Sequence, residues 1–206
     1  NAVNVDGTLN LLIAARHAGV KRVVAASSSS VYGDTPTLPK REDMMMNPLS
    51  PYAVSKLATE QYLKAFYTSY GLETVALRYF NVFGPKQDPT SQYAAVIPNF
   101  ITAAIRNTAP EVHGDGGQTR DFCYIDNVVA ANLAAMNTAN KLQGEVVNIA
   151  CGERISLNDL LDILGEEVGH RVERKYVEPR AGDVRDSLAD IGRARDFYVG
   201  KLGCRE

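Results

Sequence analysis

The stretch Lys21-Arg22-Val23-Val24-Ala25-Ala26-Ser27-Ser28-Ser29-Ser30 decides the fold. Its apolar centre, residues 23–26, is a short run that suits a buried strand. Upstream, apolar residues recur at helical spacing over residues 3–18, and Gly19 is a good helix stop. A helix that leads directly into a buried strand is one step of an α/β alternation.

The same alternation follows downstream. Residues 33–51 are rich in proline and predict a long irregular loop. Residues 52–70 return to helical spacing and end at Gly71, and residues 73–80 read as a second buried strand. The order α-β-α-β with apolar strands predicts an α/β protein with a doubly wound parallel sheet.

The second half of the chain is more mixed. We expect helices over 93–107, 126–139 and 191–198, and one that opens at Ser156; Asp126 is the expected N-cap of the second. We expect strands over 122–125, 145–150 and 171–177. The sequence divides into residues 1–81, the second half of a nucleotide-binding sheet domain, and residues 82–206, a smaller mixed α/β substrate-binding region. Elements near 120–150 are expected to return to the first sheet.

Composition excludes several functions. The 206 residues are 45% hydrophobic and 22% charged, which is ordinary for a globular protein and argues against disorder. The net charge of −2 gives no reason to expect nucleic-acid binding, and no apolar run is long enough to span a membrane. The cysteines (Cys123, Cys151 and Cys204) lack metal-ligand spacing. We therefore expect a cytoplasmic protein without disulfides or a metal site.

A tyrosine and a lysine suggest acid–base chemistry. Tyr52 and Lys56 are four residues apart at the start of an expected helix, so their side chains share one face. An ammonium about 4 Å from a phenol, at an effective dielectric of about 20, favours the phenolate by about 4 kcal/mol. Such a pair can act as a general base. An unrelated surface Tyr and Lys is the alternative, because this spacing also arises by chance.

The run Ser27-Ser28-Ser29-Ser30 stands at the carboxyl end of the first strand, the edge where open α/β sheets bind ligands. Hydroxyls there can donate to a substrate oxygen and relay a proton to a tyrosinate. A flexible polar loop is the alternative explanation of the serines alone.

Three segments make the reading specific. Ser28, Tyr52-Ala53-Val54-Ser55-Lys56 and Arg78-Tyr79-Phe80-Asn81 resemble the extended short-chain dehydrogenase/reductase family, which includes NAD-dependent epimerases and dehydratases of nucleotide sugars. The resemblance continues through Gly114-Asp115-Gly116, Arg120-Asp121-Phe122 and Asn148-Ile149-Ala150, in order along essentially the whole chain. Ser27–Asp34 is most similar to the branch of 4-epimerases that act on UDP-N-acetylglucosamine.

The resemblance implies a Rossmann-like sheet, NAD as cofactor and a role for each motif residue. Tyr52 takes the proton of the sugar 4-hydroxyl while a hydride leaves carbon 4 for the nicotinamide. Lys56 holds the nicotinamide ribose and favours the tyrosinate, and Ser28 hydrogen-bonds the reacting oxygen. Phe80 lies beside the nicotinamide and Asn81 lies on the diphosphate. The 4-keto sugar then turns over and takes the hydride back on its other face.

The resemblance also implies a set of substrate contacts. Ser29 and Ser30 are expected beside the sugar with Ser28. The cations of Arg120 and Arg180 suit the diphosphate of UDP, and Asp183 can accept from the ribose hydroxyls. The backbone near Val96 and the His113 side chain are expected by the uracil. Without the resemblance, Arg120 would be read as a surface salt bridge with Asp121, and residues 180–183 as a solvated turn.

Two observations choose among the reactions of the family. Sugar 4,6-dehydratases carry an Asp-Glu pair just after the catalytic Ser/Thr, and here Ser29 and Ser30 stand there. Hydroxyls cannot replace two carboxyls as acid and base, which ranks a dehydratase below an epimerase. Ser187 aligns with a place where epimerases that reject acetamido sugars carry a bulky tyrosine. Its small side chain predicts interconversion of UDP-N-acetylglucosamine and UDP-N-acetylgalactosamine.

Several alternatives stay open. A decarboxylase of the same family is one, and a scaffold or regulator that has lost catalysis is another. The Gly-rich NAD fingerprint of the family is not among these 206 residues. We therefore expect them to belong to a longer protein whose N-terminal portion carries that fingerprint. An inactive fragment is a third alternative. The helices at 3–18 and 52–70 carry more apolar residues than one core face needs, which predicts a homodimer formed through them.

Overall fold

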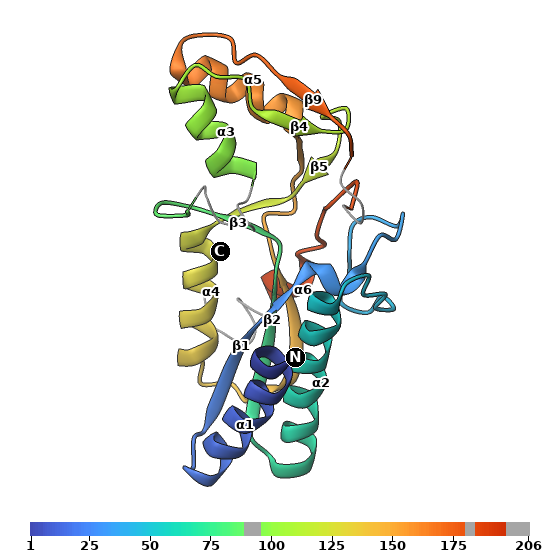
Figure 1. Ribbon diagram of the computed structural model, residues 1–206. Coiled ribbons are helices and arrows are strands. Elements are labelled where there is room, and N and C mark those ends of the chain that lie inside the picture. The colour runs from blue at the N-terminus through green and yellow to red at the C-terminus, as the bar shows by residue number, and fades with distance from the viewer. Residues whose placement is uncertain (89–95, 180–183, 197–206) are drawn as a thin grey trace.

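The computed structural model describes residues 1–88, 96–179 and 184–196. Figure 1 shows two packed regions, with a parallel sheet and its helices below and a smaller mixed α/β region above. The long strands of the sheet are β1 (Arg22–Ser28), β2 (Glu73–Tyr79) and β7 (Gln143–Ile149), in the order β1-β2-β7. Both pairings are parallel, which confirms the predicted parallel Rossmann-like sheet.

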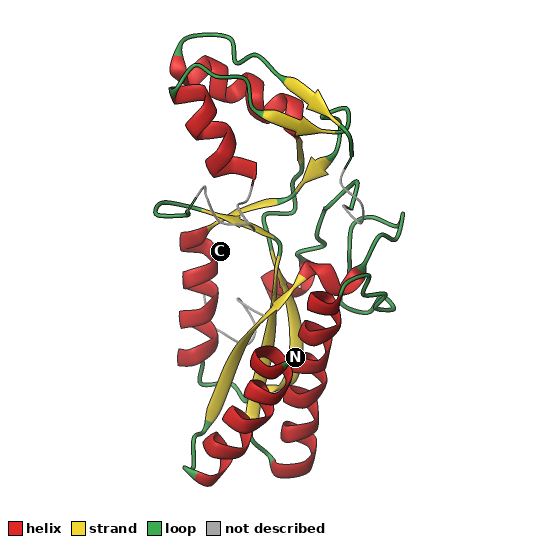
Figure 2. Ribbon diagram, in the orientation of Figure 1, coloured by secondary structure: helices red, strands yellow, loops and turns green. Residues whose placement is uncertain are grey.

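Helices cover both faces of this sheet (Figure 2). One face packs against α1 (Gly7–His17), which follows a short π-helical turn over Ala2–Asp6, and against α2 (Pro51–Tyr70). The other face packs against α4 (Ile125–Asn137). Side chains of β2 alternate between the two cores: Val75 and Leu77 face α4, and Ala76 faces α1 and α2. Burial on both faces is why these strands read as continuous apolar runs.

The upper region is built from short elements. The helices α3 (Val96–Ile105) and α5 (Leu157–Val168) pack on each other, with Phe100, Val112 and Leu161 in their core. Three two-stranded sheets connect the region: β3 (Asn81–Phe83) with β6 (Phe122–Tyr124), β4 (Glu111–His113) with β9 (Lys175–Val177), and β5 (Thr119–Arg120) with β8 (Ile155–Ser156). The chain also contains a 3-10 turn over Ser29–Tyr32 and α6 (Gly192–Asp196).

Some local expectations need correction. The strand expected over 171–177 is confined to Lys175–Val177. Asp126 is not the N-cap of α4: Tyr124 occupies that position in extended conformation, and Asp126 lies in the first turn, where its charge favours the helix dipole. Ser156 does cap α5, because its Oγ accepts a hydrogen bond of 3.0 Å from the Asp159 N–H.

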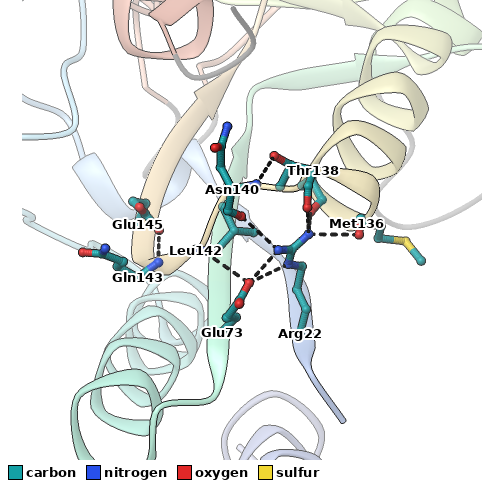
Figure 3. Close-up of polar contacts among 9 residues, drawn as sticks. Arg22, Glu73, Met136, Thr138, Asn140, Leu142, Gln143 and Glu145 are labelled. Carbon is teal, nitrogen blue, oxygen red and sulfur yellow. Dashed lines mark hydrogen bonds and ion pairs between the residues drawn. The ribbon is translucent and has the colours of Figure 1, made fainter. Parts of the chain in front are cut away.

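Arg22 closes the end of the sheet away from the polar edge (Figure 3). Its guanidinium makes a 2.6 Å ion pair with Glu73 of β2. It also donates to the carbonyls that end α4 and start the turn into β7, those of Ala135, Met136, Thr138 and Asn140. A cation at a helix C-terminus satisfies carbonyls that have no partner within the helix. One side chain thus joins β1, β2 and the α4–β7 connection.

Candidate active site

The serine run lies at the carboxyl end of β1, as the sequence indicates. β1 ends at Ser28, whose extended backbone begins the 3-10 turn. The Ser28 Oγ accepts hydrogen bonds from the Ser30 N–H (3.2 Å) and the Ser30 hydroxyl (2.9 Å). Ser28, Ser29 and Ser30 all line one cavity of about 300 Å³, called the serine cavity below. The hydroxyls therefore face a space where a small ligand group fits.

Helix α2 brings the Tyr-Lys pair to the same end of the sheet. Ser50 caps the helix by accepting from the Ala53 N–H at 3.1 Å, and Pro51 occupies the first turn, so Tyr52 and Lys56 stand one turn apart. The Lys56 ammonium lies 5.8 Å from the centre of the Tyr52 ring and donates to the carbonyl of Ala26 in β1 at 3.0 Å. Its burial lowers the pKa of Lys56. Lys56 thus connects the pair to the strand that carries the serines.

Tyr52 itself is open to solvent. Its side chain is 52% exposed, and within the described ranges no group is hydrogen-bonded to its hydroxyl. It does not line the serine cavity. The structure thus places Tyr52 beside Lys56 near the carboxyl end of β1 but outside the serine cavity, with its side chain open to solvent.

The end of β2 forms the next wall of the serine cavity. Phe80 is buried, and its ring packs 6.3 Å from that of Tyr32. Asn81 starts β3, and its side-chain amide donates to the Asp121 carbonyl (3.3 Å) and the Ser187 hydroxyl (3.4 Å). Ser187 also lines the cavity, so a small side chain forms part of its wall.

A larger cavity of about 660 Å³, called the upper cavity below, adjoins the serine cavity. Asn81 and Arg120 line both, so the two spaces meet at these residues. Val96 and His113 line the upper cavity, and the His113 ring nitrogen Nδ1 lies 2.9 Å from the Glu178 carbonyl. The predicted substrate residues thus form one path from the serines to His113, except Arg180 and Asp183, which lie outside the described residues.

Arg120 and Asp121 have different environments. The Arg120 guanidinium donates to the carbonyls of Thr119 and Arg185, both at 2.9 Å, and Arg120 lines both cavities. Asp121 is fully buried, so it is not the surface residue that a surface salt bridge would need. Its carboxylate accepts from the backbone N–H groups of Cys151, Gly152 and Ala189 at 2.9–3.1 Å. Burial raises the pKa of Asp121, and these hydrogen bonds oppose the rise.

Sequence reasoning missed Lys40. It lines the serine cavity although it comes from the proline-rich loop, and it is only 3% exposed. Its ammonium is hydrogen-bonded to the carbonyl and hydroxyl of Thr35, and burial lowers its pKa. The backbone of Lys40 pairs with Leu188 and Asp190, which brings the loop to the cavity. Loops carry no periodic signal, so nothing in the sequence marks this contact.

The sheet order β1-β2-β7, with helices on both faces and polar residues gathered at its carboxyl edge, defines a Rossmann-like α/β protein. Residues 1–150 match the NAD dependent epimerase/dehydratase family, and the chain belongs to that family. No helix in the part of the chain that the structure describes is long and apolar enough to cross a membrane.

Three relatives of this chain are named as 4-epimerases of UDP-sugars. A solved UDP-N-acetylglucosamine 4-epimerase from Methanobrevibacter ruminantium, in complex with UDP-N-acetylmuramic acid, is 42% identical with a TM-score of 0.90, over 98% of this chain and 63% of that one. UDP-glucose 4-epimerase from Mycolicibacterium smegmatis is 40% identical, over 94% of this chain and 61% of its own length. UDP-glucuronate 4-epimerase from Thermodesulfobacterium geofontis is 36% identical, over 93% and 58% respectively. The chain thus spans less than two thirds of each relative.

Proposed function

We propose that this chain is part of an enzyme that interconverts UDP-sugars by 4-epimerisation. The observation that carries the proposal is the single path formed by the serine cavity and the upper cavity, which meet at Asn81 and Arg120. Serine hydroxyls line its sheet end, and Arg120 lines both cavities. The Tyr-Lys pair lies outside the cavities, where Lys56 is hydrogen-bonded to the strand that carries the serines. This order matches a sugar, a diphosphate and a nucleoside laid along one line.

Each residue of the candidate site has a role in this reaction. Tyr52 acts as the general base that takes the proton from the sugar 4-hydroxyl, with the Lys56 ammonium 5.8 Å from its ring centre. Ser28 donates to the same sugar oxygen, since its Oγ accepts from Ser30 and keeps its own O–H for a ligand. Ser29 and Ser30 bind the neighbouring sugar hydroxyls. Asn81 and Arg120 hold the diphosphate at the junction of the two cavities, and Val96 and His113 contact the uracil.

Lys56 of α2 and Phe80 at the end of β2 also fit NAD. The Lys56 ammonium uses one N–H on the Ala26 carbonyl, which leaves two for the hydroxyls of the nicotinamide ribose. The buried ring of Phe80 supplies an apolar wall. When bound, NAD supplies a hydride acceptor that returns what it takes, so the reaction has no net redox change. The protein orients the sugar and moves the proton at its 4-oxygen.

The sugar that we propose is the N-acetylglucosamine/N-acetylgalactosamine pair. Its support is Ser187, a small residue on the wall of the serine cavity, hydrogen-bonded to Asn81. To test the function, the full-length protein is incubated with NAD and each of UDP-N-acetylglucosamine, UDP-glucose and UDP-glucuronate, and the products are identified by NMR. The 4-epimer is expected. Release of carbon dioxide would point to a decarboxylase, and a 4-keto-6-deoxy product to a dehydratase.

Ser187→Tyr tests the choice of sugar. A tyrosine on this wall fills the space for a 2-acetamido group, so we expect turnover of UDP-N-acetylglucosamine to fall roughly 10–200-fold while UDP-glucose turnover changes little. Ser187→Ala is the matched control, because it keeps the space and should keep both activities. Undiminished turnover of the acetamido substrate by Ser187→Tyr would remove the support for this sugar.

We also propose that two copies pair through α1 and α2. Both helices leave apolar side chains in solvent: Leu11 is 57% exposed and Val54 is 52% exposed. Burying such a shared face suits a two-fold bundle of four helices. Leu11→Asp is expected to convert the dimer into a monomer in analytical ultracentrifugation. Val129→Asp, an equally apolar and exposed position on α4, serves as the control and should stay dimeric.

A further inference from the structure

Two buried oxygen atoms in the upper cavity have no partner. The side-chain Oε1 atoms of Gln87 and Gln118 are buried, and neither has a hydrogen-bond partner within the described residues. Both residues line the upper cavity. A buried amide oxygen without a donor costs free energy, and a bound ligand that offers a donor recovers that cost. The cavity is therefore prepared for a ligand with N–H or O–H groups.

The orientation of the Gln118 amide is fixed by its other end. Its nitrogen Nε2 donates to the His113 carbonyl at 2.5 Å, and a carbonyl can only accept. The amide therefore cannot be turned around without placing two oxygen atoms against each other. Gln118 is only 7% exposed and its Oε1 is buried, so this oxygen is hardly reached from bulk water, while the residue itself lines the upper cavity.

We propose that Gln118 Oε1 accepts a hydrogen bond from the N3–H of a uracil base and so selects the base of the substrate. This inference rests on the proposed function. The Gln118 amide is hydrogen-bonded to the backbone carbonyl of His113, and we place the uracil beside His113. In a uridine nucleotide, N3 carries the only N–H of the base. Cytosine presents an acceptor at the same atom, which would oppose Oε1 and weaken binding.

The test removes the hydrogen bond from each side in turn. Dissociation constants of UDP and N3-methyl-UDP are measured by calorimetry for the wild-type full-length protein and for Gln118→Met. We expect the wild type to bind UDP about tenfold more tightly than N3-methyl-UDP, and Gln118→Met to bind both within about twofold. Gln143→Met, an exposed glutamine at the start of β7, is the control and should retain the full tenfold ratio.

Each of the other outcomes contradicts a specific part of the inference or of the proposed function. A wild type that does not distinguish the two ligands would overturn the inference without any variant. So would a preference that persists in Gln118→Met. If Gln118→Met instead loses discrimination between UDP and 2′-deoxy-UDP, Oε1 binds the ribose and the base assignment is wrong. Failure of the wild type to bind UDP would overturn the proposed function as well. If the wild type binds UDP but its preference over N3-methyl-UDP does not depend on Gln118, this inference alone is overturned.

Discussion

Tyr52→Phe is expected to lower kcat on a UDP-sugar roughly 10²–10⁴-fold, while KM stays within a few-fold, because a positioned proton-transfer group contributes about that factor. The substitution removes one oxygen from a side chain that is already 52% exposed, so it leaves no buried group unpaired. The loss would therefore be a loss of chemistry and not of folding. Steady-state kinetics and a thermal melt measure the two effects separately.

Tyr70→Phe is the matched control for this result. Tyr70 lies at the other end of α2 and is also 52% exposed, and its ring rather than its hydroxyl makes the described contacts, with Phe66 and Arg16. We expect wild-type kcat from it. If Tyr52→Phe retained most of its activity, another group would take the proton and the role given to the Tyr52 phenol would be wrong.

The predictable part of the fold is the part that is buried on both sides. The strands around 23–26, 73–80 and 145–150 were readable because two-sided burial produces continuous apolar runs, and the structure confirms all three in one parallel sheet. The strands β3, β4, β5 and β8 could not be predicted, because two or three residues are too few for a period and no apolar run marks these four, unlike the equally short β6 (Phe122–Tyr124). They form only where the tertiary structure brings their partners beside them.

The candidate site divides in the same way. Ser28, Tyr52 and Lys56 could be predicted, because a short motif fixes their spacing and a strand end or a helix turn fixes their place. Lys40 and Gln118 could not be, since each reaches a cavity only through the folded backbone around it. Asp121 is a third case: its sequence neighbour Arg120 suggests a surface ion pair, yet the fold buries its carboxylate among backbone N–H groups.

A buried ion pair holds the catalytic elements together. Arg78 at the end of β2 makes two hydrogen bonds of 2.7 Å to the Glu60 carboxylate of α2, and their side chains are 4% and 2% exposed. Glu60 also accepts from the Ser27 hydroxyl at 2.5 Å. Arg78 donates to the Tyr32 hydroxyl, which donates in turn to Asn148 of β7. The network thus ties the residue before Ser28 to the helix that carries Tyr52 and Lys56.

Glu60→Leu is expected to destabilise the protein by about 3–5 kcal/mol, because it leaves the Arg78 guanidinium buried without its counter-charge. Arg78→Met should destabilise the protein by a similar amount, since it leaves the buried Glu60 carboxylate without its counter-charge. The free energy of unfolding in urea measures both. Glu173→Ala is the control: it breaks the exposed pair with Arg171, whose side chains are 86% and 74% exposed, and should change stability very little.

The double variant Glu60→Leu/Arg78→Met separates stability from position. Replacing both charges by apolar groups removes the unpaired ion, so we expect the double variant to be more stable than either single variant. Its kcat should nevertheless stay below that of the wild type, because Ser27 has lost the carboxylate that anchors the end of β1. Stability recovered together with full activity would show that the pair serves folding alone. A double variant as unstable as the sum of the single losses would show that packing around the pair, and not its charge, sets the cost.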